Sequence, residues 1–288
     1  MRKTLYLLPL IIIFIGCGQP DYTIISDPVW IESWQKGEGG SGLVKALEKE
    51  TGKNISFMPG ELTGDRGYIE EILSRAKGET VILSPLFSGG VDPQMSERAG
   101  KKTVLLSFTE RKKGNFSVPI RMSRLEAFRK AGETCARMLL EEPDVYGNRA
   151  AAVFYTAIPR RREEMEMFKS GFTGIHSPDK LKIFEITTID DRKSLRPFLD
   201  ELKRSNTKLV LLAASRLNIF GIEECARENC RVILEEGSGF EAFQEYIAGS
   251  IEIDQFLLLK TAVSIPFEEA AETVVEADFV WKSDVSSH

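Results

Sequence analysis

Short apolar runs alternate along the chain with longer segments in which apolar residues recur every three or four positions. The short runs are typical of buried β-strands and the longer segments of amphipathic helices. The expected strands are residues 22–27, 54–60, 79–86, 101–108, 116–122, 149–156, 180–189, 207–215, 230–237, 255–265 and 278–282. The expected helices are residues 40–52, 65–78, 123–142, 162–174, 192–206, 219–229, 239–250 and 266–277.

This alternation predicts an α/β protein with parallel sheets, because helices of about 10–15 residues connect neighbouring parallel strands. The series runs once to residue 122 and restarts with the long amphipathic helix 123–142. We therefore expect two Rossmann-like lobes joined by a hinge. The first lobe is expected over 17–122, completed by 265–288, and the second over 123–264.

The chain opens with two basic residues and then carries no charge up to Gly16. This apolar segment is shorter than the roughly 20 residues that span a membrane, and it fits the apolar region of a signal peptide. Cys17 directly follows the glycine, and the arrangement resembles a bacterial lipobox, with Phe14 where leucine is usual. The resemblance implies a signal peptide over 1–16, a lipid anchor on Cys17, and a place in the cell envelope facing the periplasm or the exterior. The alternatives are a secreted protein cut nearby and a signal segment that stays in the membrane.

Composition argues against several classes of protein. Hydrophobic residues make up 42% and charged residues 28% of the chain, which is typical of a globular protein. The net charge of −5 disfavours a nucleic-acid partner, because phosphates attract basic surfaces. The chain contains no H-E-x-x-H, P-loop or G-x-S-x-G motif and only two histidines, so we expect no enzyme activity, no metal and no cofactor.

Three cysteines follow the expected anchor. Cys135 lies on the apolar face of an expected helix and is interpreted as a buried free thiol. Cys225 and Cys230 are five positions apart and either form a disulfide or stay free, because the geometry that decides between the two cannot be read from spacing.

The order of elements resembles the type I periplasmic binding protein fold, which sugar-binding, basic-membrane-protein and LacI-like proteins share. The strand YTIISD ends in Asp27, the strand KKTVLLSF precedes the first crossover, and the helix RLEAFRKAGETCARMLLEE opens the second lobe. RAAAVFYT and QFLLLKTAVSIPFEEAAETVV, the latter as the return crossover, extend the resemblance over nearly the whole chain. Phe168 stands where the family often has arginine, so no binding role is assigned to that position.

The resemblance implies that the carboxyl ends of the strands in the two lobes face one another, and in open α/β sheets ligands bind beyond those ends. The loops that follow the expected strands contain aromatic, hydroxyl and charged side chains. The candidate ligand-binding residues are Asp27, Trp30, Trp34, Glu61, Phe87, Arg160, Ser215, Arg216 and Glu235.

The main candidates have structural alternatives. Trp30 and Trp34 suit a sugar ring or a nucleobase, and they equally suit packing of their loop onto its own lobe. Arg160 begins a run of three arginines that either binds a carboxylate or phosphate or is simply solvated. Glu235 could accept hydrogen bonds from hydroxyl groups or an amine. Residues 37–42 match G-x-G-x-x-G but do not directly follow a strand, which argues against a dinucleotide.

The combined interpretation is an extracytoplasmic solute-binding lipoprotein of an ABC-type uptake system. It would bind a small polar solute, with sugars and nucleosides preferred, between the lobes and deliver it to a membrane permease. The alternative is an envelope lipoprotein of the same fold that binds a protein partner and no small ligand. A pocket with convergent polar groups favours the first function, and a packed apolar seam favours the second.

Overall fold

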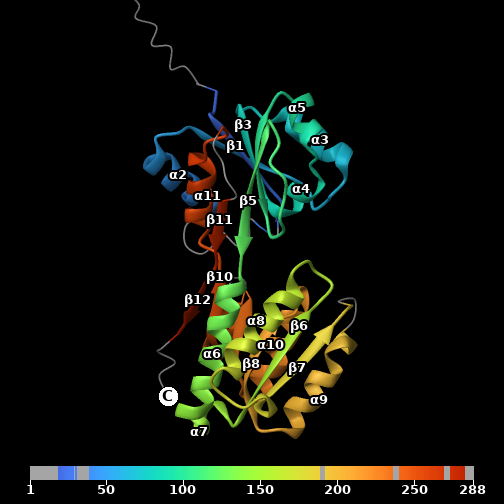
Figure 1. Ribbon diagram of the computed structural model, residues 1–288, viewed down its shortest axis with the longest axis vertical. Helices are drawn as coiled ribbons and strands as arrows, with labels where there is room; N and C mark the ends of the chain where they lie inside the picture. Colours follow the sequence, from blue (N-terminus) through green and yellow to red (C-terminus); the bar gives the residue numbers. More distant parts are fainter. Residues whose placement is uncertain are drawn as a thin grey trace, which may run out of the picture.

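The computed structural model has two lobes stacked along its long axis (Figure 1). Within the described residues each lobe contains a six-stranded sheet with helices on both faces, which confirms the expected α/β fold. The structure describes residues 19–28, 30, 39–188, 192–235, 240–268 and 273–282. Among them no helix is both long and apolar enough to cross a membrane.

The first lobe contains a parallel sheet with the strand order β11-β5-β4-β3-β1-β2. Its strands are β1 (Tyr22–Ser26), β2 (Ile55–Pro59), β3 (Thr80–Leu83), β4 (Lys102–Ser107), β5 (Ser117–Ser123) and β11 (Thr273–Glu276). Its helices are α2 (Gly39–Thr51), α3 (Arg66–Arg75), α4 (Pro85–Gly90), α5 (Pro93–Arg98) and α11 (Gln255–Ser264).

The second lobe contains a sheet with the order β12-β10-β9-β8-β6-β7, in which only the edge strand β12 runs antiparallel to its neighbour. Its strands are β6 (Arg149–Tyr155), β7 (Leu181–Ile186), β8 (Thr207–Ala213), β9 (Arg231–Glu235), β10 (Ile247–Glu252) and β12 (Asp278–Trp281). Its α-helices are α6 (Leu125–Glu141), α7 (Pro143–Tyr146), α8 (Arg161–Thr173), α9 (Arg196–Arg204) and α10 (Asn218–Arg227). Its short 3₁₀ turns are η1 (Pro178–Lys180), η2 (Arg192–Leu195), η3 (Ser215–Leu217) and η4 (Glu241–Tyr246).

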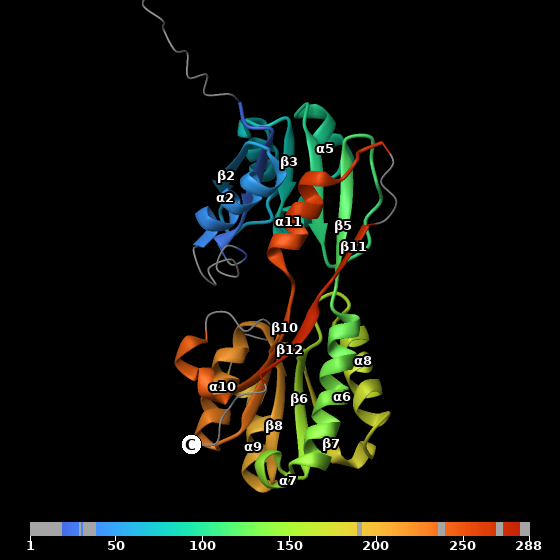
Figure 2. The ribbon, with the colours of Figure 1, turned by 90° about the vertical axis from the view of Figure 1, so that its left-hand side faces the viewer.

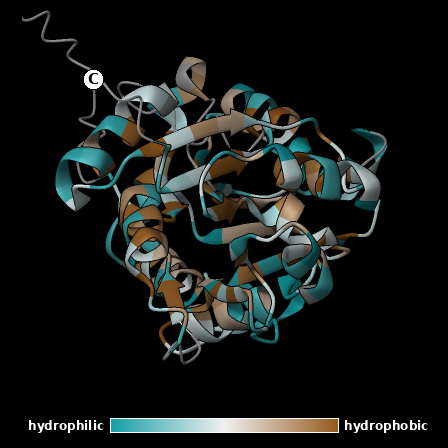
Figure 3. Cartoon of the chain, turned by 90° about the horizontal axis from the view of Figure 1, so that it is seen from above, coloured by the Kyte–Doolittle hydropathy of each residue, from teal (hydrophilic) through white to brown (hydrophobic). Residues whose placement is uncertain are grey.

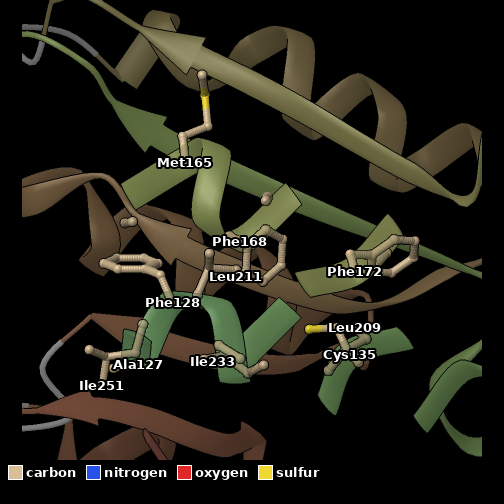
Figure 4. Packing of buried hydrophobic residues seen from close by; sticks show 14 of the residues in the cluster. Ala127, Phe128, Cys135, Met165, Phe168, Phe172, Leu209, Leu211, Ile233 and Ile251 are labelled. Atoms are coloured by element: carbon tan, nitrogen blue, oxygen red, sulfur yellow. The ribbon is translucent and has the colours of Figure 1, made fainter. Parts of the chain in front are cut away.

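Each sheet has an apolar core on both faces, because successive strand residues point to opposite sides. In β1, Ile24 belongs to the core under α2 and α11, and Ile25 to the core under α3, α4 and α5. In the second lobe α6 and α8 cover one face, where Phe128 and Phe168 meet Leu211 of β8 (Figure 4). Helices α9 and α10 cover the other face. Figure 3 shows hydrophobic segments on the central strands, surrounded by helices in which hydrophobic and hydrophilic residues alternate.

The described chain crosses between the lobes at three places, residues 123–124, 252–255 and 276–278 (Figure 2). Two crossings lie side by side, since the Ala277 N–H donates to the Ser123 carbonyl oxygen at 2.7 Å. Ile253, in the remaining crossing, packs against a core of each lobe. These crossings form the hinge that the sequence predicts between the lobes.

The C-terminal elements differ from the prediction. Residues 239–250 were expected to be helical, but η4 and the buried strand β10 occupy this region. The expected strand 255–265 is helix α11, and the expected helix 266–277 contains strand β11. The leucine-rich segment becomes a helix because the Asp254 carboxylate caps it, accepting the Leu257 N–H at 2.9 Å, and because Leu258, Leu259, Ala262 and Val263 form one buried face.

The assignment of segments to lobes changes with these elements. Helix α11 packs in the first lobe rather than extending the second lobe to residue 264. Strand β12 then returns to the second lobe, where it pairs with β10, although residues 265–288 were expected to complete the first. Similarly, the expected helix 192–206 is divided into η2 and α9, because Pro197 lacks an N–H and fits only in the first turn of α9.

Candidate functional site

The carboxyl ends of the parallel strands in each sheet face the other lobe. Strand β5 ends at Ser123, where the chain enters the second lobe, so the strands parallel to β5 also end on that side (Figure 1). Strand β10 ends at Glu252, where the chain returns to the first lobe, and its parallel neighbours end beside it. We call these two sets of strand ends and their loops the facing edges.

Asp27 and Trp30 lie at the facing edge of the first lobe, directly after β1. The Asp27 carboxylate accepts the Trp30 backbone N–H at 3.0 Å and the Ser84 hydroxyl at 2.7 Å. Each carboxylate oxygen therefore has a donor within the same lobe, and the aspartate orders the loop after β1 as a helix cap does. Trp30 is half-buried and packs against the apolar core under α2 and α11.

Glu61 and Phe87 follow β2 and β3, and they differ in their exposure to solvent. Glu61 is exposed, and its backbone N–H donates to the Tyr68 hydroxyl at 2.7 Å. Phe87 is fully buried in helix α4, where its ring packs against Gly60 so closely that a Cβ on that glycine would lie inside 3.0 Å. The expectation of Phe87 as a ligand contact is therefore corrected: the chain turns into α4 at Pro85 and carries the ring into the core.

Four ionisable side chains form a buried ion-pair network at the facing edge of the second lobe. The Glu235 carboxylate, at the end of β9, accepts hydrogen bonds from both Arg124 and Arg161. Arg124 also donates from Nε to Glu164 at 2.9 Å, and the Arg161 Nη1 lies 3.0 Å from the same carboxylate. The exposed fractions are 0% for Arg161, 3% for Glu164, 6% for Arg124 and 9% for Glu235. Two guanidinium groups thus balance two carboxylates where bulk water screens little.

The two carboxylates of the network differ in acidity. Burial raises the pKa of Glu235, but the two guanidinium groups outweigh it and hold that pKa below its ordinary value. Burial dominates at Glu164 and raises its pKa, although Arg124 and Arg161 oppose the shift. Glu235 is therefore the carboxylate that the network stabilises in its charged form.

Hydrogen bonding within the network is incomplete. Among the described residues, Arg161 Nε has no hydrogen-bond acceptor and Glu235 Oε2 has no donor. Arg161 Nη1 is ion-paired with Glu164 but is not oriented to form a hydrogen bond. Buried polar groups without partners cost free energy, so a donor and an acceptor brought by another molecule would stabilise this edge. Aromatic rings flank both arginines. The centre of the Phe108 ring lies 4.4 Å from the guanidinium carbon of Arg124, and the centre of the Phe128 ring lies 5.7 Å from that of Arg161.

The remaining second-lobe candidates occupy loops. Arg160 and Ser215 follow β6 and β8 in left-handed backbone conformations, with φ of 63° and 55°. Arg160 forms an ion pair with Glu163 at 2.9 Å, and Ser215 and Arg216 are exposed in η3. The expected site residue Trp34 and the expected anchor Cys17 lie outside the described residues.

Sequence reasoning placed Glu235 at this edge but missed the residues that hold it. Arg161, and not its neighbour Arg160, points into the lobe, and Arg124 and Glu164 were not among the candidates. Two signals were available: Glu164 follows Arg161 by three positions on one helix face, and Arg124 directly follows the last strand before the crossover.

The described part of the chain also contains three cysteines. Cys135, Cys225 and Cys230 are free and buried. Among the described residues, no group of three His, Cys, Asp or Glu side chains is arranged to hold a metal ion.

Comparisons with known proteins identify the architecture. No protein-family model matches the chain, and no curated sequence matches it significantly. A solute-binding protein of an ABC transporter system from Aeropyrum pernix K1 superimposes with a TM-score of 0.65 at 13% identity, over 91% of this chain and 76% of that one. A substrate-binding protein of a sugar ABC transport system from Bordetella parapertussis 12822 gives 0.60 at 13%, over 94% and 92%. A transcriptional activator of the comK gene from Bacillus halodurans gives 0.67 at 12%, over 91% and 90%.

At these identities the similarity concerns the fold alone. Two of these structures are solute- or substrate-binding proteins and one is a transcriptional activator, so the fold by itself does not select one activity. The superpositions nevertheless extend over both lobes, because they cover 91% to 94% of the chain. The chain has the type I periplasmic binding protein fold.

Proposed function

We propose that this protein is an extracytoplasmic solute-binding lipoprotein of an ABC-type uptake system. The observation that carries the proposal is the pair of facing edges joined by a three-segment hinge. In α/β proteins ligands bind beyond the carboxyl ends of parallel strands, and two such edges on a hinge can close around one molecule. A small polar solute, such as a sugar or a nucleoside, fits this arrangement.

The polar groups at the facing edges support a solute that offers both donors and acceptors. The unpartnered Glu235 Oε2 would accept a hydroxyl or amine proton, and the unpartnered Arg161 Nε would donate to an oxygen. Opening of the lobes would have to expose these atoms, since both side chains are buried. The other proposed contacts are Asp27, Trp30, Trp34, Glu61, Arg160, Ser215 and Arg216.

The proposed location follows from the N-terminal sequence. Processing before Cys17 would leave that cysteine as a lipidated N-terminus on the outer side of a membrane. The lobes would then face a membrane permease, which is the proposed partner. Mass spectrometry of the protein extracted from membranes tests the anchor, because it predicts a lipid-modified peptide beginning at Cys17 and none beginning at Met1.

A thermal-shift screen tests solute binding. The chain from residue 17 onward, with Cys17→Ser to keep it free of lipid, is heated with sugars, nucleosides, amino acids and small carboxylates. A ligand present at 100 times its Kd stabilises the folded state by about 2.7 kcal/mol, which raises the Tm measurably. A shift that is restricted to one chemical class supports the proposal, and calorimetric titration then measures the affinity. A folded sample that responds to no class contradicts it.

A second function is favoured by one specific observation. Asp27, the acidic side chain that directly follows β1, already accepts a hydrogen bond on each carboxylate oxygen from residues of its own lobe. This self-sufficiency suits an envelope protein of the same fold that binds a protein partner and no small ligand. Cross-linking in intact cells distinguishes the two functions, because a permease is expected under the first and an envelope protein outside any transporter under the second.

A further inference from the structure

Arg124 is the one described residue in which the end of a first-lobe strand, the buried network and an aromatic ring of the first lobe meet. It directly follows β5, its guanidinium bonds Glu164 and Glu235, and the same group lies 4.4 Å from the centre of the Phe108 ring. We propose that Arg124 couples the ion-pair network of the second lobe to the orientation of the first lobe, through Phe108. The coupling involves no solute and therefore does not depend on the proposed function.

The Arg124 guanidinium is held by residues of the second lobe. It bonds helix α8 through Glu164 and strand β9 through Glu235, and only 6% of Arg124 is exposed. Separating a buried guanidinium from its carboxylates would leave charges without compensation, which is strongly unfavourable. When the lobes rotate, this group therefore moves with α8 and β9.

The Phe108 ring is held by the core of the first lobe. Phe108 directly follows β4, and it packs against the core that α2 and α11 cover. A cation over an aromatic face is attracted by the ring quadrupole, and the attraction falls as the two separate. The Arg124–Phe108 contact is thus an interaction across the hinge that favours the lobe orientation in which it forms.

Two consequences follow. Replacing the ring by an aliphatic side chain of similar size would remove the attraction while retaining apolar bulk, and would populate other orientations. Removing the Glu235 carboxylate would have a similar effect, because the Arg124 guanidinium would lose one of the partners that hold it against the Phe108 ring. Since both changes act on one contact, their effects would not add.

Spin-label distance measurements test the coupling. Labels on Lys45→Cys in α2 and Glu166→Cys in α8 report the interlobe distance, because both positions are exposed helical sites in different lobes. The protein is the chain from residue 17 onward carrying Cys17→Ser, and its three native cysteines are buried. No solute is added.

The expected result is a broader distance distribution for Phe108→Leu than for the parent. The loss of a cation–π contact changes the ratio of orientations by roughly five- to thirty-fold. Phe108→Trp, which keeps an aromatic face, is expected to retain the parent distribution. The matched control Phe116→Ala removes a 37% exposed ring at the opposite end of the same sheet and is expected to change nothing.

The proposal is overturned if Phe108→Leu leaves the distribution unchanged, or if Phe108→Trp broadens it as much as leucine does. Glu235→Gln provides the second test, with circular dichroism as the check of folding. Broadening by Glu235→Gln that Phe108→Leu does not increase further supports the relay through Arg124, and full additivity of the two changes contradicts it. The result for Phe108→Leu can be interpreted by itself, so the proposal remains testable even if Glu235→Gln does not fold.

Discussion

Gly132 of α6 lies directly against the backbone carbonyl of Phe168 in α8. A Cβ atom on this glycine would lie well inside the 3.0 Å that real Cβ atoms keep from other heavy atoms, and Gly171 approaches the Arg129 carbonyl in the same way. The two helices therefore touch backbone to backbone beside the core shown in Figure 4. This close packing fixes α8, which carries Arg161 and Glu164, against α6, which follows Arg124.

We expect Gly132→Ala to destabilise the fold. The added methyl group meets backbone atoms that cannot rotate away, and such overpacking typically costs about 1–3 kcal/mol. Urea unfolding of the variant measures the loss as a lower midpoint with an unchanged slope. Gly89→Ala in α4 is the matched control, since its Cβ would meet nothing within 4 Å. Equal midpoints for the two variants would contradict the packing argument.

The two glutamates of the network are expected to differ in their contribution to stability. Glu235→Gln removes the carboxylate that holds both guanidinium groups, and removal of one partner from a buried ion pair costs about 3–5 kcal/mol. Glu164→Gln is expected to cost less, because burial already disfavours the charge of that carboxylate. Chemical unfolding at pH 7 compares the two. A larger loss for Glu164→Gln would reverse the assignment of roles.

The stability of the protein should also depend on pH through these groups. The folded-state pKa of Glu235 lies below its ordinary value of 4.5, so its stabilising contribution is complete above pH 4.5 and disappears as the pH falls through the lowered value. The pKa of Glu164 is raised above 4.5, so its contribution increases as the pH falls from neutrality toward 4.5. The difference in unfolding free energy between the parent and Glu235→Gln is therefore expected to be constant near neutrality and to shrink below pH 4.5. A constant difference down to pH 3 would be inconsistent with the lowered pKa.

If the thermal-shift screen identifies a solute, Trp30 is expected to contact it. Loss of an aromatic stacking partner in Trp30→Ala should weaken binding by roughly two- to tenfold. Trp281→Ala is the control, because that ring packs against Tyr146 and Phe279 on the flank of the second lobe. Calorimetric titration of both variants decides the matter. An unchanged Kd for Trp30→Ala would leave only the packing role of this side chain.

The buried thiols should resist modification in the folded protein. Burial raises the pKa of Cys135 and Cys225, and it raises that of Cys230 to about 11, so little reactive thiolate forms at pH 8. In the Cys17→Ser chain, alkylation is expected to be slow until denaturant is added, after which all three thiols react without a reductant. Reaction of Cys135 alone under those conditions would instead show a disulfide between Cys225 and Cys230.

The pattern of apolar residues was sufficient to predict the fold class, the two lobes and the strands up to β9. Local periodicity carries this information, because a strand or an amphipathic helix must present apolar side chains at its own spacing. The same pattern failed for 239–277, where the leucine-rich run 255–265 looks alike as a strand or a helix. Only the surrounding structure decided there, through the Asp254 cap and the burial of one face of α11.

The candidate site could likewise be predicted only in part from the sequence. That Asp27 and Arg160 follow strands and Glu235 lies near a strand end could be read from the sequence, and the carboxyl ends of parallel strands share one edge. Which charges are buried could not, since Arg161 and Arg160 are adjacent and only the direction of the first turn of α8 separates them. The network itself joins residues 124, 161, 164 and 235, and its Phe108 contact crosses the hinge. Such contacts depend on how distant segments are brought together in space, and only the tertiary structure decides that.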